Sequence, residues 1–141
     1  MEDKKTYIKL FNLVEKLKKA DDPKRKYEFI LFLGKKLKVP NNNILIPENK
    51  VQGCVSQVFV KEIFQEGKLF WEGYSDALIT KGLLAFLISG MNELTPKEVV
   101  NINNKFIEDT GLKASLTPSR SNGFLNILLK MQSQANHYMS K

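Results

Sequence analysis

The residue best suited to chemistry is Cys54, the only cysteine among 141 residues. It follows Gly53 in the segment NKVQGCVSQVFV, residues 49–60, at the start of an alternating apolar run. A glycine at this position permits a tight turn, and positive charge from Lys50 and Arg120 would favour the nucleophilic thiolate. A free cysteine is, however, usually a buried and inert residue. The segment alone therefore leaves an inert thiol and a nucleophile equally open.

A second group of polar residues lies in the segment TPSRSNG, residues 117–123. Arg120, next to the exposed N–H groups of a helix start, would suit an anion or a carboxylate on a partner. The alternative is an ordinary capped helix start whose polar side chains are solvated. Asp76 likewise has a structural explanation as an acid in the first turn of a helix.

Several classes of enzyme are not expected from this composition. One cysteine and one histidine cannot supply a zinc or cluster site by themselves. His137 is close to the end of the chain, where a catalytic base is rarely held in place. The phosphate-binding glycine motifs of nucleotide enzymes are missing from the sequence. We therefore expect no metal and no self-contained hydrolase.

The elements that must position these residues follow from periodicity and from start and stop signals. Apolar spacing predicts an amphipathic helix within residues 1–20 and a second one from Pro23, capped by Asp22, to about Leu37. A long connection with two prolines and a run of three asparagines follows. Alternation over residues 55–64, with Val55, Gln57 and Phe59 on one face, predicts a strand that pairs with residues 68–74.

The second half of the chain predicts three helices. The first runs over residues 75–90, with Ser75 as N-cap and Gly90 as its end, and is apolar enough to be the central buried helix. A capping box starts the next at Thr95, with Gly111 closing it, and Thr117 starts the last. The expected fold is a single α+β domain over residues 1–141, a small antiparallel sheet packed against helices.

The net charge of +7 comes mainly from lysines before Pro40, interleaved with apolar residues at helical spacing. This pattern is typical of solvated helix faces, although a basic module that binds nucleic acid is the alternative. Against that alternative, Phe59, Phe70 and Trp71 follow a pattern suited to a core. No leader or membrane-spanning segment is predicted, so we expect a cytoplasmic protein.

Three motifs in order, GCVSQV, SDALITKGLLA and LTPSRSNGFLNIL, resemble the SufE family of sulfur acceptors in iron–sulfur cluster assembly. The resemblance extends over residues 27–131 and implies a fold shared with IscU-like scaffold proteins. Phe59 is a departure, because a tryptophan is common there in the family.

The resemblance implies that Cys54 takes persulfide sulfur from a SufS-type cysteine desulfurase, stimulates that enzyme, and delivers sulfur to a SufBCD-type scaffold. Such a chain is a carrier with no cofactor of its own, since pyridoxal phosphate belongs to the desulfurase. It is expected to be a monomer or weak homodimer that binds neither nucleic acid nor membranes. The residues expected in the loop or at the partner interface are Lys50, Gln52, Gly53, Ser56, Gln57, Asp76, Arg120 and Asn122.

Two further expectations concern how the sulfur is handled. An apolar surface formed by Val55, Phe59, Leu83 and Phe124 would shelter the persulfide from solvent thiols, and the long connection before Cys54 would let it swing out. An alternative role is activation of the desulfurase without sulfur transfer, which would not require Cys54.

Overall fold

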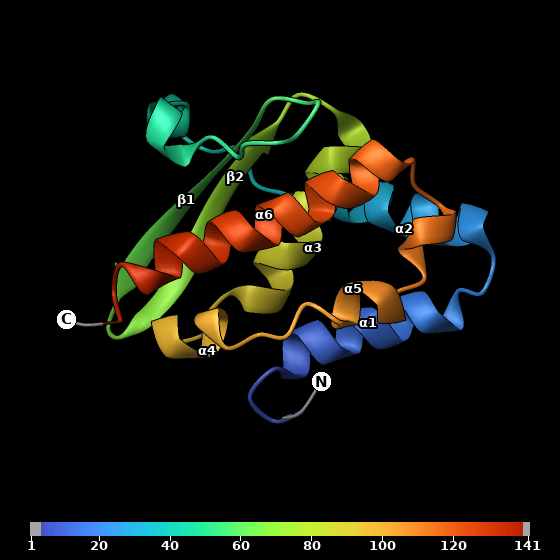
Figure 1. The fold of residues 1–141 in the computed structure, drawn as a ribbon, viewed down its shortest axis with the longest axis horizontal. Coiled ribbons are helices and arrows are strands. Elements are labelled where there is room, and N and C mark those ends of the chain that lie inside the picture. Colours follow the sequence, from blue (N-terminus) through green and yellow to red (C-terminus); the bar gives the residue numbers. More distant parts are fainter. Residues whose placement is uncertain (1–3, 140–141) are drawn as a thin grey trace.

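The computed structural model describes residues 4–139. Along the chain, two N-terminal helices come first, a β-hairpin follows, and the remaining helices form the C-terminal half (Figure 1). The fold is α+β, as expected. The elements are α1 (Ile8–Lys19), α2 (Pro23–Lys36), the 3₁₀ turns η1 (Asn42–Ile44) and η2 (Pro47–Asn49), β1 (Val58–Gln65), β2 (Lys68–Ser75), α3 (Leu78–Met91), α4 (Pro96–Val100), α5 (Phe106–Asp109), η3 (Leu112–Ala114) and α6 (Pro118–Asn136).

The first two helices form as their sequences predict. Helix α1 buries one stripe, Leu10, Val14 and Leu17, although it begins at Ile8, and residues 1–3 of the expected helical range lie outside the described part. Helix α2 begins at Pro23, where the Asp22 side chain accepts a hydrogen bond from the Lys24 N–H. This cap satisfies one of the free donors of the first turn.

The two strands pair antiparallel, with Val58 opposite Ser75 and Gln65 opposite Lys68. Val58 and Val60 face the core together with alternate residues of β2: Leu69, Trp71, Gly73 and Ser75. Phe59 and Phe70 lie on the other face and are half-buried, so of the three aromatics only Trp71 is in the core.

Strand β1 begins at Val58, so the prediction of a strand from Val55 is wrong. The reason is that the chain folds back before Val58, where the Val51 N–H donates to the Val58 carbonyl at 2.9 Å. Residues 52–57 therefore form a turn outside the hairpin.

Helix α3 lies at the centre of the molecule, between α1, α2, β2 and α6 (Figure 1). Eleven of its residues are buried, as its apolar sequence predicts. Its predicted ends are wrong, because Ala77 is the N-cap and Gly90 lies inside the helix, against Leu10 of α1. Ser75 belongs to β2 instead, where its hydroxyl oxygen accepts from the Ala77 N–H at 3.3 Å.

The predicted helix over residues 95–111 is in fact two short helices, α4 and α5. Its capping box at Thr95 and Glu98 is confirmed. The interruption falls on an Asn-rich stretch, where the Asn103 side chain accepts from the Lys105 N–H at 2.9 Å. Asparagine side chains compete in this way with helical hydrogen bonding. Gly111, at φ 70°, ends the second helix, and Thr117 caps α6 as predicted.

Candidate functional site

Cys54 lies in a short closed turn, which we call the tip and define as residues 52–57. The turn is closed at its base by the hydrogen bond from the Val51 N–H to the Val58 carbonyl and by a β-bridge between Lys50 and Phe59. Val51 is 1% exposed. The base of the tip is thus fixed in the core, while the tip itself lies at the surface.

The Cys54 thiol is directed at the backbone of α6. Its Sγ lies 3.8 Å from the Gly123 carbonyl oxygen and would be in ordinary contact, 3.5 Å, with a Cβ at Gly123. The side chain is half-buried and packs against the hydrophobic core. This burial raises the pKa of the Cys54 thiol. The stabilisation of the thiolate that we expected from Lys50 and Arg120 is therefore not seen in this resting arrangement.

Gly53 forms the turn that precedes the cysteine. Its φ of 80° is a conformation that residues with a Cβ rarely adopt, and its carbonyl accepts a hydrogen bond from Nδ2 of Asn126 at 3.1 Å. A Cβ on Gly53 would lie 2.5 Å from that nitrogen. Asn126 was missed by the sequence analysis, because an asparagine inside a helical pattern has no feature that marks it as a partner of a distant loop.

Asp76 holds the other end of the tip. Its Oδ1 accepts from the Gln57 N–H at 2.9 Å, and its own N–H donates to the Gln57 carbonyl at 3.2 Å. Asp76 lies before α3, so its interpretation as a first-turn acid is wrong. Its prediction as a neighbour of the Cys54 loop agrees with these contacts.

Contacts between polar side chains link Ser56 of the tip to Arg120 through Thr80. The Ser56 hydroxyl lies 3.3 Å from the Thr80 hydroxyl, and Nη1 of Arg120 lies 3.5 Å from the same Thr80 oxygen. Arg120 is half-buried at the edge of a hollow of about 380 Å³, which Val55 borders on the other side. The full lining is Tyr27, Val55, Ile79, Ser115, Leu116, Thr117, Ser119 and Arg120. Of the other predicted residues, Gln52 and Asn122 are exposed and Lys50 is half-buried.

Two apolar side chains are exposed in the segments that form the site. Val55 is 79% exposed and Leu78, at the start of α3, is 74% exposed. Val55 therefore does not cover the sulfur in this arrangement, whereas Leu83 and Phe124 are fully buried in the core against which Cys54 packs.

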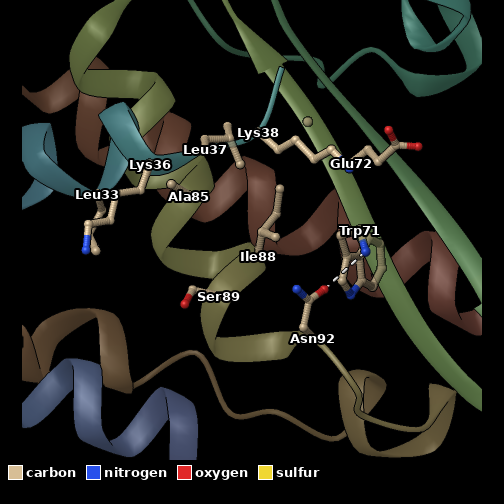
Figure 2. A pocket seen from close by; sticks show the side chains of 11 residues that line it. Leu33, Lys36, Leu37, Lys38, Trp71, Glu72, Ala85, Ile88, Ser89 and Asn92 are labelled. Carbon is tan, nitrogen blue, oxygen red and sulfur yellow. Dashed lines mark hydrogen bonds between the residues drawn. The ribbon is translucent and has the colours of Figure 1, made fainter. Parts of the chain in front are cut away.

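A second hollow, of about 350 Å³, is separate from the thiol site (Figure 2). It lies between the end of α2, strand β2 and the outer face of α3. At one end, the Asn92 side chain accepts from the backbone N–H of Trp71 at 3.1 Å, while the buried indole N–H has no partner among the described residues. None of the predicted site residues lines this hollow.

Within residues 4–139, no group of three or more His, Cys, Asp or Glu side chains is placed to hold a metal ion. The same part of the chain contains no helix long and apolar enough to cross a membrane.

Comparison with known proteins decides the family. The SufE family model, described as an Fe–S metabolism associated domain, matches residues 11–135. The chain belongs to the SufE family. A SufE-like protein of Synechocystis is 50% identical over 126 residues, which are 89% of this chain and 79% of that relative. This resemblance covers the whole site described above.

Two other relatives are longer than this chain. SufE-like protein 1, chloroplastic/mitochondrial, of Arabidopsis thaliana is 42% identical over 130 residues, 92% of this chain but 35% of the plant protein. The cysteine desulfuration protein SufE of Plasmodium falciparum is 33% identical over 86% of this chain and 54% of its own length. A solution structure of a hypothetical protein from Thermus thermophilus has the same fold, with a TM-score of 0.80 and 22% identity over 94% of this chain and 97% of that one.

Proposed function

We propose that this SufE protein is a sulfur carrier that accepts persulfide sulfur on Cys54 from a SufS-type cysteine desulfurase, stimulates that enzyme, and passes the sulfur to an iron–sulfur scaffold of the SufBCD type. The observation that carries the proposal is the placement of the only cysteine. It lies at a surface turn with its thiol half-buried against α6, next to exposed apolar side chains.

The reaction needs only one thiol on this chain. The Cys54 thiolate attacks the outer sulfur of the desulfurase persulfide, forming a new S–S bond on Cys54 while the S–S bond on the partner breaks. The electron pair of the broken bond leaves with the partner's cysteine as a thiolate, so no outside oxidant or reductant is consumed. A second cysteine nearby would attack the persulfide and release its sulfur, and the sequence contains none.

The surface around the thiol supports a protein partner. Val55 and Leu78 offer apolar contact area, and Arg120 at the edge of the adjoining hollow offers a bidentate donor for a partner carboxylate. Asp76 contributes by holding the end of the tip at Gln57. The pyridoxal phosphate of the reaction resides on the desulfurase, and this chain supplies only its thiol. A reducing cytoplasm suits a carrier whose cysteine has no disulfide partner.

Mass spectrometry tests the proposal directly. The chain is mixed with a SufS-type desulfurase and cysteine, and the Cys54 peptide is examined without reductant. We expect an added mass of about 32 Da, one sulfur atom, on Cys54, and no such mass anywhere in Cys54→Ser. An unmodified Cys54 peptide at full desulfurase turnover would refute sulfur acceptance.

The same pair of proteins separates transfer from activation. If Cys54→Ser still stimulates the desulfurase fully, the chain acts as an activator, and the transfer part of the proposal is wrong. If the variant binds the desulfurase but no longer stimulates it, stimulation arises because Cys54 removes the sulfur.

A further inference from the structure

The connection between α2 and β1 is anchored along its second half, up to Val51. Ile44, Asn49 and Val51 are all at least 97% buried, and Nδ2 of Asn49 donates to the Ile44 carbonyl at 2.9 Å. From outside the connection, Nζ of Lys130 on α6 donates to the carbonyl of Glu48 at 2.7 Å. These contacts argue against a connection that swings out as a whole.

The tip has a different set of contacts. Between the fixed pair Val51 and Val58, the side chains of the tip are exposed or half-buried. Among the described residues, its first half is held by one hydrogen bond of normal length, from Asn126 to the Gly53 carbonyl. The thiol contact with Gly123 is a weak one at 3.8 Å. In the second half of the tip, the Ser56 hydroxyl lies 3.3 Å from the Thr80 hydroxyl, and Asp76 binds the last residue, Gln57.

We propose that Asn126 is a positioning residue for Cys54: it holds the tip closed against α6, and the tip alone, hinged at Val51 and Gln57, is the unit that presents the cysteine. The role in sulfur acceptance rests on the proposed function, whereas the effect of Asn126 on access to the thiol does not.

The hinge limits how far the cysteine can travel. Cys54 is three residues from Val51, and an extended chain spans roughly 3.3–3.6 Å per residue, so its Cα can lie at most about 11 Å from that of Val51. A partner must therefore bring its persulfide close to Val55 and the hollow that it lines. Opening of the tip also removes Sγ from the apolar contacts that raise its pKa.

The lone cysteine makes the test clean, because iodoacetamide reports on one thiol only. The alkylation rate of the full chain is measured at fixed pH for wild type, Asn126→Ala and the isosteric Asn126→Asp, which loses the amide donor. We expect both variants to react about 2- to 10-fold faster, the change in an opening equilibrium when one hydrogen bond is lost.

Lys130→Ala is the matched control. Lys130 lies one turn further along α6 and binds the same connection, but outside the tip. We expect its alkylation rate to equal that of wild type. An equal acceleration in Lys130→Ala would overturn the hinge at Val51, and an unchanged rate in both Asn126 variants would overturn the role of Asn126.

Low urea concentrations separate local opening from a general loss of stability. Opening of the tip exposes little surface, so the accelerated rate should not change with urea, whereas alkylation through global unfolding rises steeply with it. A steep urea dependence in Asn126→Ala would show a merely structural role and refute the proposal.

The sulfur acceptance assay is then run on the same variants. If Asn126→Ala reacts faster with iodoacetamide but no variant, wild type included, accepts sulfur, the positioning role stands and the proposed function fails. If wild type accepts sulfur and Asn126→Ala alkylates at the wild-type rate, the function stands and the positioning role fails.

Discussion

Replacement of Gly53 by alanine should open the tip more strongly than any other single methyl group added to the site. Two costs act on the closed state. Alanine at the φ of 80° that Gly53 adopts costs roughly 1–2 kcal/mol. The added Cβ would also lie 2.5 Å from Nδ2 of Asn126, and displacing that amide loses a hydrogen bond of about 0.5–1.5 kcal/mol. Together these favour an open tip by about 1.5–3.5 kcal/mol, or roughly 10- to 400-fold.

The rate of Cys54 alkylation by iodoacetamide measures this change in the opening equilibrium. Two further variants separate the backbone cost from the cost of displacing the Asn126 amide. In an Asn126→Ala background the steric part is absent, so Gly53→Ala should accelerate alkylation only about 5- to 30-fold, the backbone cost alone. Gly67 is a matched control, because it has the same φ of 80° but no atom of residues 4–139 within 4 Å of an added Cβ. Gly67→Ala should lower the free energy of unfolding by about 1–2 kcal/mol without changing alkylation in the absence of urea.

Two results would refute this reasoning. If Gly53→Ala lowers the free energy of unfolding as Gly67→Ala does but leaves the alkylation rate unchanged, the strain is not relieved by opening of the tip. If the effects of Gly53→Ala and Asn126→Ala are additive, the alanine methyl group does not meet the Asn126 amide, and the closed arrangement is wrong.

Three other predictions follow from the same structure. Gly82→Ala should cost about 3 kcal/mol or more of unfolding free energy in urea, because its Cβ would lie 2.2 Å from the Ile30 carbonyl oxygen where α2 and α3 cross; an unchanged midpoint would contradict this crossing. Asp76→Ala should remove the side-chain acceptor of the Gln57 N–H and accelerate Cys54 alkylation about 2- to 10-fold, whereas Asp76→Asn, which keeps the acceptor, should restore most of the wild-type rate. Burial raises the pKa of Cys54, so alkylation of wild type should rise with pH around a midpoint above the ordinary value of about 8.5. The Cys54 thiol then loses its proton at a higher pH in the folded state than in the unfolded chain. The stability that the protonated thiol contributes is therefore lost as pH rises through that range. A midpoint below about 8.5 would contradict the burial.

The sequence predicted the elements whose signals are local. Caps such as Asp22, Thr95 and Thr117 act on the residues that immediately follow, and the apolar runs of α3 and β2 identify core elements by composition. The predicted ends failed where a distant contact decides them. Val55 has the residue type of a strand, yet it lies in a turn because Val51 pairs with Val58.

In the candidate site, too, residues with a local signal were predicted, whereas the roles that depend on a distant partner were missed. Cys54 and Gly53 could be identified from the segment itself, and the later motifs pointed to Asp76 and Arg120. The interpretation of Asp76 as a first-turn acid was wrong, since its partner Gln57 is 19 positions earlier in the chain, whereas its prediction as a neighbour of the Cys54 loop agrees with that contact. Asn126 escaped detection for a similar reason, because its partner, Gly53, is 73 positions earlier in the chain.

The resting arrangement of Cys54 is unfavourable for a nucleophile, and this favours a carrier over a free-standing catalyst. At neutral pH a thiol with a raised pKa is almost entirely protonated, and only the thiolate attacks a persulfide. A stand-alone enzyme would need that thiolate at all times, whereas a carrier needs it only when its partner is bound. A partner that displaces the tip would expose the sulfur and remove the cause of its raised pKa in one step. Small oxidants, which make no contacts with Val55 or Leu78, gain no such help in opening the tip. In the proposed mechanism, a closed tip therefore gives Cys54 selectivity for the protein that opens it.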